Sequence, residues 1–292
     1  MKNSQSTVED FINLLKPRVM ALAIFTSVCG LILSQQEIHP FFFALSIFCI
    51  SLGAGASGAI NMWYDRDIAA LMDRTKGRPI PTGKVNGFDA LGFGIILSLI
   101  SVILLGLAVN YFAAFLLACS ISFYIFIYTI WLKRRTPHNI VIGGAAGAFP
   151  PMIGCACATG DLTLFPLILF AIIFIWTPPH FWALSLYKDI EYSKANVPML
   201  PVVSGKSHTK KQILLYSILL FFVSLLPFFL NFAGEIYLIA ALILNFYFLF
   251  LSFKLTKING KDSLFFASRL FKYSILYLYL IFLVLVIDSI VI

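Results

Sequence analysis

Long uncharged segments run through almost the whole chain and decide what it can fold into. A helix needs about 20 apolar residues to cross the roughly 30 Å hydrocarbon core of a bilayer. Nine segments meet or approach that length: residues 17–36, 41–63, 89–109, 111–132, 139–158, 162–186, 212–231, 235–255 and 272–292. Charged residues make up 12% of the chain, whereas a soluble domain carries about 25%. The pattern predicts an all-α polytopic membrane protein, a single domain of nine transmembrane helices over residues 1–292.

The positions of the basic residues predict how the chain is oriented. If the N-terminus is cytoplasmic and the nine segments alternate in direction, all 21 Lys and Arg fall on the cytoplasmic side. An excess of Lys and Arg in cytoplasmic loops sets the orientation of membrane proteins. We therefore expect the N-terminus inside and the C-terminus outside. The net charge of +8 is then a topology signal, which disfavours nucleic acid as a partner.

Two cytoplasmic loops, 64–88 and 187–211, are much longer than the other connections. Each follows the second segment of a set of four, so the chain reads as two similar four-helix halves plus one further helix. Facing halves are a common plan of membrane proteins, and a secondary transporter is therefore one alternative. Transporter sites lie near the middle of the bilayer, however, whereas the charge of this chain gathers at one end.

The first long loop opens on a concentration of polar residues. Asn61 and Asp65 are one helical turn apart and are expected to offer oxygen atoms to the same space. Amide and carboxylate oxygens suit Mg²⁺, which proteins often hold together with substrate phosphates. Basic residues that can neutralise phosphate follow at Arg74, Lys76 and Arg78. The combination predicts a site for a metal-bridged diphosphate; the alternative is a solvated loop whose charges only anchor the topology.

Longer motifs connect this pattern to a known family. The chain contains the stretches NMWYDRDI, DRTKGRPIP, RRTPHNIVIGGAAGAFPP, TPPHFWALSLYKD and VPMLPVV. With them it resembles the heme-farnesylating branch of the UbiA-type intramembrane prenyltransferases, the protoheme IX farnesyltransferases or heme O synthases. The resemblance is dense between residues 12 and 210. The Asn-x-x-x-Asp segment is typical of the whole superfamily, and the third and fourth stretches are typical of the heme branch.

The resemblance implies a reaction, a cofactor and a location. The reaction is transfer of farnesyl from farnesyl diphosphate to a vinyl group of heme B, which yields heme O for terminal oxidases. Mg²⁺ is the implied cofactor, and the lipid bilayer of the bacterial inner membrane is the implied location. Terminal oxidase assembly or heme A synthase are the implied partners. The nearest alternative is a related enzyme that acts on a quinone-ring precursor.

The same resemblance assigns roles to residues of both long loops. Asn61 and Asp65 are expected to be catalytic and, with Glu191, to hold the metal; Asp67, Asp73 and Asp189 are further candidate ligands. The expected diphosphate-binding residues are Arg66, Arg74, Lys76, Arg78, Lys133, Arg134, Arg135 and Lys188. The family usually has another Asp one turn after Asp65, where this chain has Ala69.

His180 and Trp182 are the residues expected to bind heme. An ionisable side chain within a membrane segment is costly and tends to be functional. A neutral imidazole can ligate heme iron, and the heme substrate gives His180 a reason to do so. The alternative is a structural role, in which His180 bonds a backbone carbonyl that Pro179 leaves free.

Overall fold

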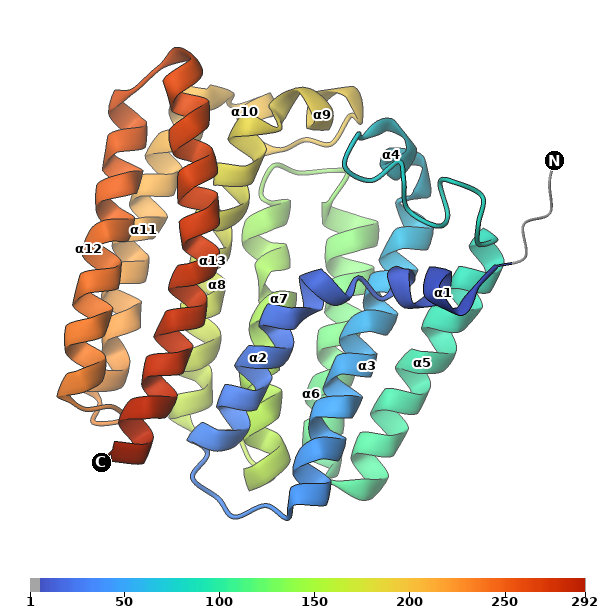
Figure 1. The fold of residues 1–292 in the computed structure, drawn as a ribbon, viewed down its shortest axis with the longest axis vertical. Coiled ribbons are helices and arrows are strands. Elements are labelled where there is room, and N and C mark those ends of the chain that lie inside the picture. Colours follow the sequence, from blue (N-terminus) through green and yellow to red (C-terminus); the bar gives the residue numbers. More distant parts are fainter. Residues whose placement is uncertain (1–5, 292) are drawn as a thin grey trace.

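The chain folds into a bundle of long helices (Figure 1). A computed structural model describes residues 6–291, except the side chains of Asp189 and Lys261, and the described part contains no strand. The elements are α1 (Val8–Leu14), α2 (Pro17–Leu33), α3 (Pro40–Tyr64), α4 (Arg66–Leu71), α5 (Gly87–Ala108), α6 (Tyr111–Ser122), the π-helix η1 (Phe123–Leu132), α7 (Asn139–Thr159), α8 (Leu164–Tyr187), α9 (Asp189–Lys194), α10 (Leu200–Val203), α11 (Gly205–Phe229), α12 (Glu235–Lys257) and α13 (Gly260–Val291).

The helices confirm the predicted all-α membrane fold. Within the described residues, eight spans are long and apolar enough to cross a bilayer, with α6 and η1 counted as one. The ninth is the pair α1 and α2, which meet at an angle of 57°. Two helices begin earlier than the apolar segments predict: α11 at residue 205 and α13 at residue 260. Their first turns are rich in Lys and other polar residues, which form helices well but lower the hydropathy.

Side chains pack in two large apolar clusters, and these divide the bundle differently from the predicted halves. One cluster joins α2, α3, α5, α6, η1 and α7, and the other joins α8, α11, α12 and α13. α2 and α7 contribute residues to both clusters. The final helix packs against α8, α12 and α2. It is therefore an integral part of the second cluster, and through α2 it also contacts the first cluster.

The two clusters meet where α2 crosses α7, and glycines allow the close approach. A Cβ atom added at Gly30 would lie 2.1 Å from the carbonyl oxygen of Pro151, and one at Gly154 would lie 2.1 Å from that of Ser27. Small residues at such positions let two helix backbones approach within a membrane. No larger residue fits at either glycine unless the helices separate.

Asp288 ties the end of α13 to the beginning of α12. Its buried carboxylate accepts hydrogen bonds from the backbone N–H of Gly234 at 2.5 Å and of Tyr237 at 3.1 Å. The first N–H groups of a helix have no partner within the helix. A side chain from another helix therefore caps α12.

Candidate active site

The last turn of α3 carries the two residues around which the candidate site is built. α3 ends at Tyr64 and α4 starts at Arg66, so Asp65 stands at the junction of the two helices. Asn61 and Asp65 are buried, each with 5% of its surface exposed. The Asn61 amide donates to Asp65 Oδ2 at 2.8 Å. The structure thus brings the predicted pair together, but Asn61 turns its nitrogen, and not its oxygen, toward the carboxylate.

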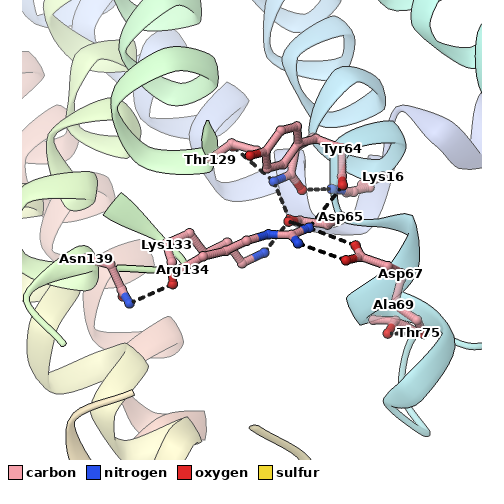
Figure 2. Close-up of polar contacts among 11 residues, drawn as sticks. Lys16, Tyr64, Asp65, Asp67, Ala69, Thr75, Thr129, Lys133, Arg134 and Asn139 are labelled. Atoms are coloured by element: carbon pink, nitrogen blue, oxygen red, sulfur yellow. Dashed lines mark hydrogen bonds and ion pairs between the residues drawn. The ribbon is translucent and has the colours of Figure 1, made fainter. Parts of the chain in front are cut away.

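Two predicted basic residues from the turn after η1 reach this carboxylate (Figure 2). Lys133 forms an ion pair with Asp65 Oδ2, and an Arg134 nitrogen lies 3.5 Å from Oδ1. Arg134 also makes a bidentate contact with Asp67, at 2.7 and 2.8 Å. These hydrogen bonds lower the pKa of Asp67 and raise the pKa of Arg134. Asp67, one of the further candidate metal ligands, is therefore already engaged by a cation.

Lys16 and Thr129 complete the site, and sequence reasoning missed both. Lys16 Nζ donates to Asn61 Oδ1 at 2.8 Å, and the Asn61 amide donates to Thr129 Oγ1 at 3.0 Å. Lys16 has a left-handed backbone, with φ of 55°, at the bend between α1 and α2. That conformation is strained for a residue with a side chain, and strain of this kind clusters at functional sites. The sequence analysis counted Lys16 only among the basic residues that predict membrane orientation.

Thr129 belongs to η1, which faces the same site with two tyrosines. The rings of Tyr124 and Tyr128 lie 5.4 Å apart, and Lys133 Nζ is 6.0 Å from the centre of the Tyr128 ring. π-helical turns are rare and frequently occur at functional sites. Nothing in the apolar pattern of residues 111–132 distinguishes this turn from an ordinary helix, so it could not be predicted from the sequence.

The remaining basic residues of the first loop, and Arg135 after η1, differ in how close they lie to the site. Arg78 is half-buried near the site: burial and the neighbouring Arg74 lower its pKa, while Asp65 opposes that effect. Arg66 and Lys76 have other partners. Arg66 donates to the Trp63 carbonyl at 2.9 Å, and Lys76 pairs with Asp73 at 2.7 Å on the exposed surface. Arg135 is also exposed.

The second long loop lies over the same end of the bundle (Figure 1). Ile68 and Met72 of the first loop share an apolar cluster with Tyr192, Ala195 and Val197 of the second. The predicted residues Lys188 and Glu191 pair with each other at 2.6 Å. The Asp189 side chain lies outside the described residues. The loops therefore close together over the mouth of the bundle.

Two carboxylate oxygens at this end lack a hydrogen-bond partner. Asp65 Oδ1 and Glu191 Oε2 are both buried without one. Among the described residues, no three His, Cys, Asp or Glu side chains are close enough to hold a metal ion together. Ala69 is buried, and its carbonyl accepts from the Thr75 hydroxyl at 2.9 Å. The unpaired oxygens fit a cation, although the predicted ligands are not assembled into one cluster.

His180 is held between α8 and α13. Its ring stacks on Trp176 and on Phe271, with centroids 4.3 and 4.7 Å away, and its Nδ1 lies 2.6 Å from Ser274 Oγ. The Ser274 hydroxyl donates its proton to the Phe271 carbonyl. In the tautomer that carries its proton on Nδ1, His180 donates to Ser274 Oγ and Nε2 keeps its lone pair. The partner of His180 is thus Ser274 and not a backbone carbonyl of its own helix.

Trp182, the other residue expected to bind heme, lies elsewhere. It is 2% exposed and packs edge-on against Tyr216 of α11, with ring centroids 5.3 Å apart. Its Nε1 is buried without a hydrogen-bond partner. The structure therefore places Trp182 in the contact between α8 and α11, apart from the His180 ring stack.

Comparison with known proteins gives a consistent result. A protoheme IX farnesyltransferase of Bartonella quintana is 51% identical over 98% of this chain and 93% of that protein. The one from Parvibaculum lavamentivorans is 53% identical over 99% and 91%. A solved structure from a study of digeranylgeranylglyceryl phosphate synthase has 20% identity and a TM-score of 0.81, covering 98% of this chain and 99% of that one. A UbiA homolog from Archaeoglobus fulgidus, bound to DMAPP and Mg²⁺, has 15% identity and a TM-score of 0.68, covering 94% and 99%.

The family comparison covers almost the whole bundle. Residues 23–285 match the UbiA prenyltransferase family, from α2 through most of α13. Relatives that are more than half identical over nearly their full length support the same family assignment. The chain belongs to the UbiA prenyltransferase family.

Proposed function

We propose that the protein transfers the farnesyl group of farnesyl diphosphate to a vinyl group of heme B and so makes heme O. The observation that carries this proposal is the relationship to protoheme IX farnesyltransferases, at 51 and 53% identity over nearly the whole chain. The geometry agrees with it, since a cationic site at the mouth of the bundle and an imidazole with a free nitrogen suit the two substrates.

The cations around Asn61 and Asp65 are suited to a departing diphosphate. Lys16, Lys133 and Arg134 converge on this pair, and preorganised charge aimed at developing charge is usually the largest catalytic term. The bond between the farnesyl carbon and the diphosphate oxygen breaks, and the electron pair leaves with the diphosphate. The vinyl group attacks the allylic cation, water adds to the resulting cation, and a proton is released. The product carries a hydroxyethylfarnesyl side chain.

Asn61, Asp65 and Glu191 are the residues we propose for Mg²⁺. The buried oxygens of Asp65 and Glu191 that lack a hydrogen-bond partner support this choice. The bound ion would neutralise part of the diphosphate charge. Asp67 and Asp73 are less suited, because their carboxylates are exposed, with 62% and 76% of the side chain accessible, whereas Asp65 and Glu191 each have a buried oxygen without a hydrogen-bond partner.

His180 is the residue we propose for the heme iron. A histidine that ligates a metal almost always donates its other ring N–H to a fixed partner. Ser274 is such a partner, and it leaves Nε2 with a lone pair. Phe271 and Trp176 hold the ring in place. Trp182 is proposed only to support α8, since it packs toward α11.

The protein is a multi-pass membrane protein, and we place it in the bacterial inner membrane with both long loops in the cytoplasm. The diphosphate is water-soluble and highly charged, which favours a site at the cytoplasmic end. Heme O would pass from here to terminal oxidase assembly or to heme A synthase.

Turnover by the purified protein tests the proposal. The protein in lipid nanodiscs is given Mg²⁺ and farnesyl diphosphate with either heme B or a quinone-ring precursor, and products are identified by mass spectrometry. We expect farnesylated heme only, formed about 100-fold more slowly or worse when Asp65→Asn replaces the wild type. Farnesylation of the quinone-ring precursor alone would contradict the proposal. The transporter alternative is tested in sealed proteoliposomes, where uptake of either substrate without chemical change would favour it.

A further inference from the structure

The hairpin of α12 and α13 carries basic side chains that no carboxylate balances. Its turn lies at the edge of the bundle, at the same end as α9 and α10 (Figure 1). Lys254 of α12 and Arg269 of α13 are both exposed, and among the described residues neither forms an ion pair. Asp262, in the first turn of α13, pairs with no described side chain either. This end of the hairpin therefore presents uncompensated positive charge.

Aromatic rings of both helices connect the two cations. Lys254 Nζ lies 5.4 Å from the centre of the Phe250 ring and 5.1 Å from that of Phe266, so it touches α12 and α13 at once. The Phe250 and Tyr247 rings are stacked, with centroids 6.3 Å apart. Arg269 Nη2 donates to Tyr247 Oη at 2.7 Å. Direct contacts therefore run from Lys254 through Phe250 and Tyr247 to Arg269.

This row of side chains borders an apolar surface. Arg269 is three positions before the apolar segment 272–292. On α12, the exposed side chains Ile243, Phe246 and Phe250 follow at spacings of three and four positions, so they share one helix face. One face of the hairpin is thus cationic near its turn and apolar further along, which matches the polar and apolar parts of a phospholipid.

Arg269 and Tyr247 retain hydrogen-bond donors that no described group uses. The contact between them occupies one N–H of the guanidinium, which carries several more. The Tyr247 hydroxyl accepts this bond and donates its own proton to no described residue. A charged side chain at the edge of the hydrocarbon layer is costly without a partner. Phosphate oxygens fit these donors, since arginine binds phosphate bidentately.

We propose that this surface binds an anionic phospholipid from the surrounding leaflet. Arg269 and Tyr247 contact its phosphate, and its acyl chains lie along Ile243 and Phe246. Basic sites between transmembrane helices bind such headgroups. Zwitterionic lipids bring an ammonium group that Lys254 repels, whereas phosphatidylglycerol brings none. The bound lipid braces α12 against α13, and the inference goes beyond the proposed reaction without depending on it.

Native mass spectrometry of the full chain, released from detergent micelles, tests the proposal. The probes are phosphatidylglycerol and phosphatidylcholine with identical acyl chains. We expect the wild type to bind one phosphatidylglycerol more tightly than phosphatidylcholine. Arg269→Gln should weaken phosphatidylglycerol binding about tenfold, the range for a charged hydrogen bond. Lys254→Gln should weaken it about fivefold, the range for one basic residue near an anionic headgroup, and should remove the preference between the two lipids.

Two further variants separate the phosphate contact from net charge. Tyr247→Phe keeps the ring and removes only the hydroxyl, so it should weaken phosphatidylglycerol binding while the melting temperature stays unchanged. Lys211→Gln is the matched control, because it removes the same charge from an exposed position at the same end of α11 and makes none of these contacts. It should bind both lipids as the wild type does.

Other outcomes would overturn the inference. Equal wild-type affinity for the two lipids would exclude recognition of an anionic headgroup. If Lys211→Gln weakened binding as much as Arg269→Gln, the net charge of the protein would account for the affinity. Glycerol 3-phosphate, a headgroup without acyl chains, should not displace the lipid at equal concentration; displacement would exclude the apolar stripe from the site. None of these measurements uses heme or farnesyl diphosphate, so the inference and the proposed function fail separately.

Discussion

Asp65 is a buried carboxylate whose charge is balanced entirely by side chains from other parts of the chain. Lys133 and Arg134 reach it from the turn after η1, and Asn61 links it to Lys16. Breaking one partner of a buried pair leaves an uncompensated charge and costs more than the pair contributes. Replacing any one of these residues should therefore change turnover or substrate binding measurably.

For Asp65→Asn we expect turnover to fall about 100-fold or more, the range for losing one strong electrostatic contact in an active site. Heme affinity should stay near the wild-type value, because His180 lies between α8 and α13. Steady-state rates and heme absorption measure the two effects. Near-normal turnover would remove Asp65 from the site.

Replacing Lys16 by Gln should raise the KM for farnesyl diphosphate about tenfold, since one charged contact to the diphosphate is lost. Lys257→Gln is the control, an exposed lysine on α12. The same change in KM for both variants would mean that Lys16 serves the membrane topology and not the substrate.

His180→Ala should abolish the imidazole contribution to the absorption spectrum of bound heme. Ser274→Ala should keep the ligand but broaden or shift the spectrum, because Nδ1 loses its partner. Heme titrations of both variants provide the measurement. An unchanged spectrum in His180→Ala, with reduced thermal stability, would assign His180 a structural role.

The site residues that were predicted from the sequence differ from those that were missed in how many sequence positions separate each residue from its partner. Asn61 and Asp65 are four positions apart, so helical periodicity alone pairs them. Lys16 reaches Asn61 from 45 positions away, Thr129 from 68, and Ser274 reaches His180 from 94. Periodicity carries no information about which helices become neighbours. Arg66 and Lys76 differ, because each bonds to a partner only three positions away, the Trp63 carbonyl and Asp73 respectively.

Among the elements, the crossing of α2 and α7 shows the same limit on prediction. Residues 143–154 contain four glycines, and small residues permit close helix packing, but composition does not say which helix approaches them. The structure pairs Gly154 with Ser27 and Gly30 with Pro151. Hydropathy located the spans well, yet it placed the starts of α11 and α13 too late, because charged turns extend these helices beyond their apolar stretches.

Gly154→Val should destabilise the protein by about 1–3 kcal/mol, because a new side chain must push α2 and α7 apart. Gly147→Val is a matched control in the same helix, since no atom lies within 4 Å of an added Cβ there. Thermal unfolding in detergent compares the two. Equal melting temperatures would show that the crossing tolerates separation.

For the whole molecule, orientation in the membrane is the property that the basic residues predict. α4, α9 and α10 gather at one end of the bundle, and the end of α13 lies at the opposite one (Figure 1). Segregation of all 21 Lys and Arg assigns the first end to the cytoplasm. This prediction uses no contact between helices, so it can be made from the sequence alone.

A reporter that is active only in the cytoplasm should stay silent when fused after Ile292, and the same reporter should be active when inserted in the loop after Gly83. Colony assays on the two fusions give the comparison. Strong activity of the C-terminal fusion would contradict nine spans with a cytoplasmic N-terminus.

The cap that Asp288 supplies to α12 has a consequence for biosynthesis. The ribosome makes Asp288 54 positions after Gly234 and 51 after Tyr237, so α12 enters the membrane before its cap exists. Until α13 arrives, the first N–H groups of α12 must find water or lipid headgroups at the membrane surface. The second cluster therefore matures only once α13 has been translated and inserted. A chain arrested before Asp288 would leave the first N–H groups of α12 without this cap.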